Sequence, residues 1–153
     1  MKSKVLLQFV LLIVFFSCST YAEERFSFGA GVGTSYSGVG ANFSQISKND
    51  MKYLSAGCYS YSNLSGSACG AGIGWIKTDL FEFQNNKHGF GAYLGAVGTE
   101  RSRFGDQTAN GLAISYNYFL RGIDKPSFNF GASFVFSEDS DSGKLIAQAG
   151  YQF

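Results

Sequence analysis

The sequence has few of the residues on which enzymes and nucleic-acid-binding proteins depend. Of its 153 residues, one is histidine, one is proline and 15% are charged, with a formal net charge of +1. This sparse and mixed charge leaves no basic surface for nucleic acid. After the apolar run Val5–Phe16, no segment has the roughly 20 apolar residues of a membrane-spanning helix. The chain is instead rich in glycine, with 20 residues, and in aromatics, with 17%, which is unusual for a soluble domain.

The first 22 residues have the three-part layout of a secretory signal peptide. Two lysines precede the apolar run and the small, polar stretch SCSTYA follows it, so we expect cleavage between Ala22 and Glu23. The run is too short for an uncleaved helical anchor. A lipoprotein attached through Cys18 is disfavoured because bulky phenylalanines stand just before it. Residues 23–153 are therefore expected to form the mature chain, which has the length of one small domain.

The mature chain alternates apolar residues with polar or small ones, which is the period of a β-strand with two different faces. The last segment, Lys144–Phe153, places Leu145, Ala147, Ala149, Tyr151 and Phe153 on one face. Eight such segments are expected, over 25–36, 39–44, 51–62, 69–75, 89–96, 112–118, 128–136 and 144–153. Short strands at this spacing indicate an all-β fold.

Turn-forming residues separate the segments and set their pairing. The first hairpin is expected to turn at Ser37–Gly38, with Tyr36 opposite Val39 and with Thr34 and Tyr36 on the apolar face. A longer hairpin is expected to end at Asn85–Asn86, because asparagine tolerates positive φ. Other connections are predicted at 47–50, at 63–66, near Pro126, at 137–143 and, as the longest loop, over the polar stretch 99–108.

The hairpin centred on residues 63 and 64 contains the only two cysteines of the mature chain. In this register Cys58 lies opposite Cys69. Leu54, Ala56 and Cys58 then face outward, and Tyr53, Tyr59 and Tyr61 face inward. In an oxidising compartment two cysteines of one hairpin usually join, so we expect one disulfide. Two free thiols are the alternative.

The apolar face could be buried, as in a soluble barrel, or exposed to lipid. The opposite face is mainly glycine, serine and asparagine with almost no charge, which would make a poor water-exposed surface. Turned inside out, small residues line a narrow lumen and large apolar residues face lipid, with Trp75 near a strand end. Closure leaves no strand edge in lipid. The sequence therefore predicts an eight-stranded antiparallel up-and-down transmembrane β-barrel.

The signal peptide, the eight segments and the ending Ala149–Phe153 resemble the small eight-stranded outer-membrane proteins of Gram-negative bacteria. The resemblance covers essentially the whole mature chain. It implies an integral outer-membrane protein among lipid and lipopolysaccharide, expected as a monomer, with both termini in the periplasm. It also implies handling by periplasmic chaperones and by the outer-membrane assembly machinery, with Tyr151 and Phe153 as the recognised positions. The connections at 37–38, 63–66, 99–108 and 137–143 would face outside.

Residues for catalysis or metal binding are scarce. The only histidine, His88, stands beside the Asn85–Asn86 turn and is expected to be a solvated turn residue. Small outer-membrane barrels that deacylate lipid A use a His-x-Ser arrangement, and the nearest string here, 59–63, has tyrosine where the base is needed. The acidic loop 137–143 lacks the spacing of a calcium loop. No catalytic, cofactor-binding or metal-ligating residue is predicted.

The sequence thus favours a non-enzymatic outer-membrane barrel with a structural or surface-interaction role. A narrow pore for very small solutes is the first alternative, because the glycine-rich lining leaves space that side chains usually fill in an eight-stranded barrel. A lipid A-modifying enzyme and a secreted, soluble ligand-binding barrel are the remaining alternatives. The enzyme lacks an identifiable base.

Overall fold

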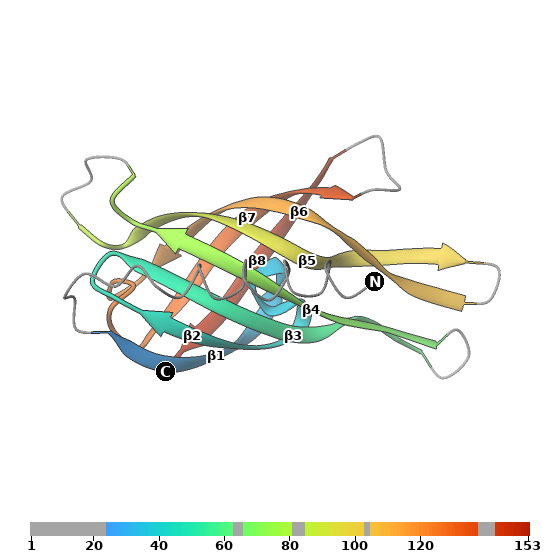
Figure 1. The fold of residues 1–153 in the computed structure, drawn as a ribbon, viewed down its shortest axis with the longest axis horizontal. Coiled ribbons are helices and arrows are strands. Elements are labelled where there is room, and N and C mark those ends of the chain that lie inside the picture. Colours follow the sequence, from blue (N-terminus) through green and yellow to red (C-terminus); the bar gives the residue numbers. More distant parts are fainter. Residues whose placement is uncertain (1–23, 63–65, 81–84, 103–104, 138–142) are drawn as a thin grey trace, which may run out of the picture.

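The computed structural model describes residues 24–62, 66–80, 85–102, 105–137 and 143–153. They form a closed barrel of eight antiparallel strands, each paired with its neighbour in the chain and the first with the last (Figure 1). The strands are β1 (Arg25–Gly33), β2 (Gly38–Ile46), β3 (Asp50–Ser62), β4 (Gly66–Lys77), β5 (His88–Ser102), β6 (Gly105–Phe119), β7 (Ser127–Ser137) and β8 (Lys144–Gln152). The predicted all-β, up-and-down barrel is confirmed.

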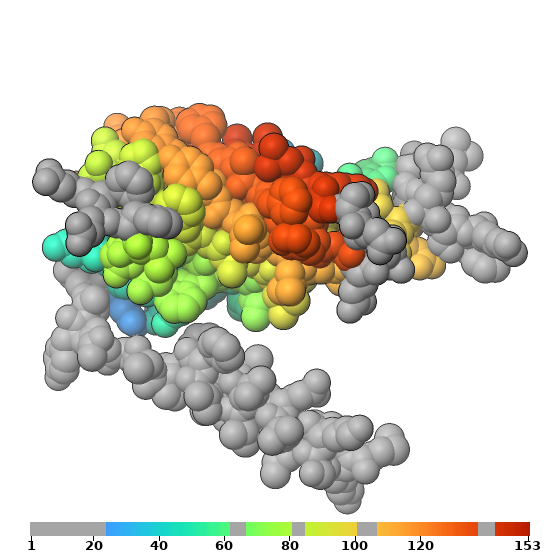
Figure 2. All heavy atoms as spheres, turned by 90° about the horizontal axis from the view of Figure 1, so that it is seen from above, coloured from blue at the N-terminus to red at the C-terminus, as the bar shows by residue number. Residues whose placement is uncertain are grey.

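Alternation of side chains across each strand explains why these segments pair. In β7, Asn129, Ser133 and Val135 are buried inside the barrel, whereas Phe128 and Phe130 are exposed outside. A one-residue slip would exchange the two faces of a strand, so the pattern fixes the register wherever the faces differ. Seen from a second side, the side chains of β6, β7 and β8 lie against one another as one surface (Figure 2).

The seam between the first and last strands closes the barrel. Four residue pairs join them, from Gly29 with Gln152 to Val32 with Ala149. Next to the Gly29–Gln152 pair, the Phe153 backbone N–H donates to the Phe28 carbonyl at 2.8 Å. The predicted closure of the last segment against the first is therefore confirmed.

The first hairpin differs from the prediction. β1 ends at Gly33, and Val32, not Tyr36, lies opposite Val39. Residues Thr34–Tyr36 form a short 3-10 helix, η1, whose three side chains are buried. The backbone leaves the wall because Gly33 has a φ of 109°, a conformation that glycine adopts readily. The expectation that Thr34 and Tyr36 face outward was wrong, because this turn directs both into the barrel.

The second hairpin has the predicted register over most of its length. Cys58 lies opposite Cys69 and Leu54 opposite Ile73. Between Cys58 and Ser60 the register shifts by one residue at a β-bulge, which reverses the alternation beyond it. Tyr61 is therefore 84% exposed, and its predicted inward placement was wrong.

The third hairpin contains no long loop. β5 and β6 remain paired through the stretch predicted as a loop, from Thr99 with Thr108 to Ser102 with Gly105. Next to a bulge between Ala96 and Gly98, Ala96 lies in the interior, out of line with the outward Ala92 and Leu94 of the same strand. The β3–β4 and β5–β6 hairpins project together at one end of the barrel (Figure 1).

At the opposite end, neighbouring turns are tied to one another. Beyond β4, the Thr78 backbone N–H donates to the Asn49 carbonyl at 2.8 Å, so this segment follows the β2–β3 turn and does not extend a paired hairpin. The Asn86 side-chain amide donates to the Asp124 carboxylate at 2.6 Å. Pro126 lies in the β6–β7 turn, as predicted. Residues 81–84 of the predicted long hairpin lie outside the described part of the chain.

Candidate functional site

The outer wall of the barrel exposes large apolar side chains from all eight strands. Leu112 and Ile114 of β6, for example, are 58% and 59% exposed. We call this surface the apolar belt; its members are Phe26, Phe28, Val32, Val39, Phe43, Leu54, Ile73, Trp75, Leu94, Leu112, Ile114, Tyr116, Phe128, Phe130, Phe134, Phe136 and Leu145. Soluble monomers rarely expose an apolar surface that continues around the whole molecule. The barrel is thus apolar outside.

The interior is polar, and its side chains bond to one another. Gln148 lies at the centre of one network, where its Oε1 atom accepts from the Ser35 and Ser133 hydroxyls at 3.2 and 3.0 Å. Its amide nitrogen donates to Asn117 Oδ1 at 2.5 Å. Satisfied hydrogen bonds make polar groups tolerable in a buried position. The network therefore joins η1 to β6, β7 and β8 across the lumen.

Tyrosine rings fill the space that the glycine-rich lining leaves. The hydroxyl and ring of Tyr36 occupy the position of a Cβ atom on Gly150, and those of Tyr93 do the same at Gly72. Tyr53 lies over Gly74 in the same way, and its ring stacks 6.3 Å from that of Tyr93. The glycines are therefore needed for close packing. At these three glycines the space inside the wall is occupied by tyrosine rings.

Tyr36 and Tyr93 are the largest fully buried side chains among the described residues, and Tyr36 is held at its polar tip. Its hydroxyl donates to Asn129 Oδ1 at 3.1 Å and accepts from Asn129 Nδ2 at 2.8 Å. Next to it, the Ser37 hydroxyl bonds to the Ser55 and Tyr93 hydroxyls, both at 2.8 Å. These contacts fix η1 as a plug across the barrel.

A second network lies beside the β1–β8 seam. The Ser27 hydroxyl donates to the Phe153 carbonyl, and the Ser44 hydroxyl donates to the Ser27 carbonyl at 3.2 Å. Because both hydroxyls have used their protons, they accept from the Gln152 amide nitrogen, at 2.9 and 2.8 Å. Gln152 thus links β8 to β1 and β2 from inside.

An apolar cluster fills the barrel near the β2–β3, β4–β5 and β6–β7 turns. Its members Ile46, Met51, Ile76, Phe119 and Ile123 are each at most 2% exposed. The alternation of the strands did not predict this cluster. The sequence nevertheless contains a sign of it. Ile46, Ile76 and Phe119 are large apolar residues at inward positions of their strands, each near the same end of the barrel. The cluster occupies that end of the lumen.

The sequence predicted that His88 is a solvated turn residue. In the structure His88 is instead the first residue of β5. Its Nδ1 atom lies 2.7 Å from the Tyr116 hydroxyl, and its ring is 5.1 Å from that of Tyr118. It belongs to an aromatic group on the outer wall. Within the described ranges, no group of three or more histidine, cysteine, aspartate or glutamate residues is arranged to hold a metal ion.

Two other predicted features have different outcomes. Tyr151 lies on the outward face of β8, and its ring packs 4.9 Å from that of Phe153, which is 61% exposed. Their role in assembly stays a prediction. Ala22 and Glu23, the predicted cleavage site, lie outside the described residues. Among the residues that are described, the only helix is η1, whose three residues fall far short of a membrane span.

Cys58 and Cys69 lie at disulfide distance across the β3–β4 hairpin, where the derived register placed them. We expect alkylation of the unfolded, unreduced mature protein to leave its mass unchanged. After reduction, two labels should be added, which also shows that the reagent reaches both sites. Two labels before reduction would contradict the disulfide. Mass spectrometry of the intact protein measures both states.

The chain was compared with protein-family models, curated proteins and solved structures. None of the three matches it.

Proposed function

We propose that the protein is an integral outer-membrane β-barrel, non-enzymatic and closed to solutes, with a structural or surface-interaction role. The observation that carries the proposal is the reversed arrangement of the barrel, apolar around the outside and polar within. In water this belt would remain unburied, whereas in a bilayer it faces hydrocarbon. The closed ring of strands also provides hydrogen-bond partners for the backbone N–H and C=O groups, which lipid cannot provide.

The filled interior favours a closed barrel over a narrow pore. Tyr36, Tyr53 and Tyr93 cross the middle of the lumen, and the cluster around Phe119 and Ile123 occupies one end. An eight-stranded barrel has just enough room inside for side chains. A solute would have to displace packed rings and hydrogen-bonded amides.

Planar-bilayer recording of the refolded protein tests closure. We expect no steady single-channel steps, because packed tyrosine rings lie across the lumen and the apolar cluster occupies one end of it. Protease protection of the same reconstituted sample shows that the protein has inserted. An absence of current steps can then be attributed to a closed barrel. Steps of constant amplitude that depend on added protein would contradict closure and favour the pore.

A surface-interaction role is supported at the end where two hairpins project (Figure 1). The Cys58–Cys69 pair joins the two strands of the β3–β4 hairpin four residues before β3 ends, and beyond this pair Tyr61 is 84% exposed. Exposed tyrosine on a braced hairpin is a suitable contact residue, because its ring offers a large contact area with few rotatable bonds. With the outer-membrane orientation, this end faces outside.

The opposite end carries the residues that we propose for assembly. Tyr151 and Phe153 lie on the outward face beside the β1–β8 seam, where the assembly machinery could reach them before closure. Lipid A modification is disfavoured, because the one histidine, His88, bonds to the Tyr116 hydroxyl and has no serine beside it in β5 until Ser102.

A further inference from the structure

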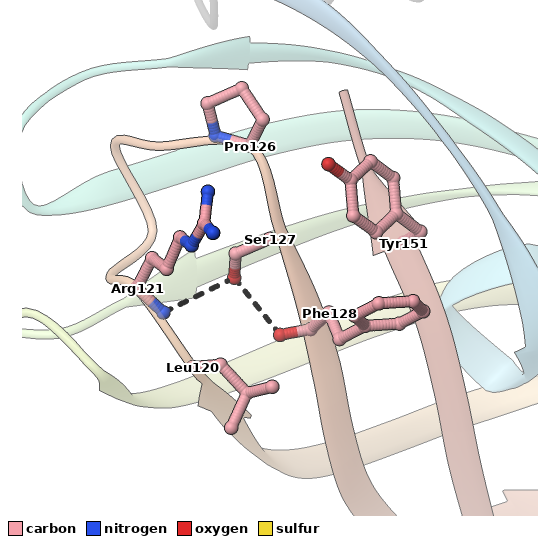
Figure 3. A pocket seen from close by; sticks show the side chains of 6 residues that line it. All are labelled: Leu120, Arg121, Pro126, Ser127, Phe128 and Tyr151. Carbon is pink, nitrogen blue, oxygen red and sulfur yellow. Dashed lines mark hydrogen bonds between the residues drawn. The ribbon is translucent and has the colours of Figure 1, made fainter.

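A pocket of about 240 Å³ opens on the outer wall beside the β6–β7 turn (Figure 3). Its lining comes from that turn and from β7 and β8, namely Leu120, Arg121, Pro126, Ser127, Phe128 and Tyr151. It lies where the apolar belt meets the polar turn. Phe128 and Leu120 on one side of this border are 54% and 45% exposed, while Arg121 and Lys125 on the other are exposed cations.

The lower walls of the pocket are apolar and firmly held. The rings of Phe128 and Tyr151 meet edge to face with their centroids 4.9 Å apart. Ser127 is used internally, since its hydroxyl accepts from the Arg121 backbone N–H at 3.4 Å and donates to the Phe128 carbonyl at 2.9 Å. These hydrogen bonds hold the backbone around the pocket in place. The walls offer a ligand mainly hydrocarbon contacts.

The rim of the pocket is positively charged. The Arg121 guanidinium and the Tyr151 hydroxyl both point toward the rim near Pro126 (Figure 3). Among the residues that the structure describes, no carboxylate forms an ion pair with Arg121. The nearest acid in the turn, Asp124, accepts from the Asn86 amide instead. The rim therefore presents a guanidinium whose planar donors suit a phosphate.

We propose that this pocket binds a phospholipid, with its anionic phosphate at Arg121 and the Tyr151 hydroxyl and its first acyl carbons against Leu120 and Phe128. The apolar walls commit the site to lipid, because free phosphate would use the rim alone. The inference rests on the proposed membrane location, in which the border of the belt lies at headgroup depth. It names one ligand of that surface.

Native mass spectrometry of protein refolded in octyl glucoside, a detergent without phosphate, tests the site. Added phosphatidylglycerol is expected to bind saturably, and diacylglycerol, which lacks the phosphate, is not. Arg121→Gln should weaken phosphatidylglycerol binding roughly tenfold or more, the effect of losing a charge-assisted hydrogen bond. Lys125→Gln is the matched control, because it removes the same charge from the same turn but not from the pocket lining.

Each other outcome is informative. Equal weakening by Arg121→Gln and Lys125→Gln would show attraction to the turn as a whole and overturn the site. Full competition by an equal concentration of inorganic phosphate would show an anion site without a lipid and overturn the assignment. Heat-modifiable gel migration of every variant shows that it has folded. Failure of the wild-type protein to fold in detergent or lipid would count against the membrane barrel itself, whereas a folded protein without the Arg121 effect refutes only this inference.

Discussion

Tyr36→Ala is expected to destabilise the folded barrel by about 3–5 kcal/mol, the cost of emptying a large aromatic site in a packed interior. Tyr36 is 1% exposed, and its ring lies over Gly31 and Gly150 in the first and last strands. Alanine would leave a cavity beside the seam, where only four residue pairs join β1 to β8. It would also leave the buried Asn129 amide without its hydroxyl partner.

The free energy of unfolding can be measured by urea titration of the protein in vesicles, followed by gel migration of unheated samples. Tyr36→Phe separates the two contributions, because it keeps the ring and loses only the hydrogen bonds, with an expected cost of about 1–3 kcal/mol. Tyr61→Ala is the matched control, since that tyrosine is 84% exposed and its loss should change stability by less than about 0.5 kcal/mol. If Tyr36→Ala were as stable as Tyr61→Ala, η1 would not be a plug.

Ile114→Arg is expected to destabilise the barrel by about 2–4 kcal/mol in a bilayer, the cost of a cation near the membrane midplane. Ile114 lies in the middle of the outward row of β6, opposite Ala92 of β5 and Phe134 of β7, and is 59% exposed. In a soluble barrel the same position would face water, where arginine is tolerated at less than about 0.5 kcal/mol. The size of the effect therefore distinguishes lipid from water around the belt.

The same urea titration in vesicles applies to this variant. Thr99→Arg is the control, because Thr99 is exposed on β5 beyond the belt, in the projecting hairpin. It should leave the free energy of unfolding nearly unchanged. Equal and small effects of the two substitutions would mean that the belt is not in hydrocarbon.

The sequence predicts this fold well because one rule, alternation, applies to every strand of a barrel. Where the turn is recognised as well, as in the hairpin centred on residues 63 and 64, even the residue pairing follows, for example Leu54 with Ile73. The rule fails where the chain leaves the wall without changing its pattern. Thr34 and Tyr36 continue the alternation of β1, and Gly33 does not stand out in a strand already rich in glycine, so nothing local marked the turn into the lumen.

Two further differences have the same kind of cause. The bulge between Cys58 and Ser60 adds one residue to β3. Tyrosine fits either face of the hairpin at this point, so the sequence did not indicate where the bulge lies. The outer part of the β5–β6 hairpin is polar on both faces and therefore carries no alternation to read. Its strands nevertheless stay paired through their backbones, and backbone pairing depends little on side-chain hydrophobicity.

The interior was predictable in kind but not in detail. Small and polar residues facing inward were correctly expected, and glycine was interpreted as free space. The structure pairs these glycines with tyrosines from other strands, as Gly72 with Tyr93 and Gly150 with Tyr36. Such contacts depend on the barrel's curvature and on strand positions far apart in the chain. Only the apolar cluster at one end is indicated by the sequence itself, through inward apolar residues such as Phe119.

The central proposal is that this barrel spans an outer membrane, with its apolar belt against lipid and its polar face inside. It is tested most directly by expressing the full chain in a Gram-negative host and separating the soluble, inner-membrane and outer-membrane fractions. Each fraction is run on a denaturing gel with and without heating. We expect the protein to be in the outer-membrane fraction and its unheated band to migrate faster than its heated band, as a compact barrel does. A protein recovered in the soluble fraction, with its belt in water, would contradict it.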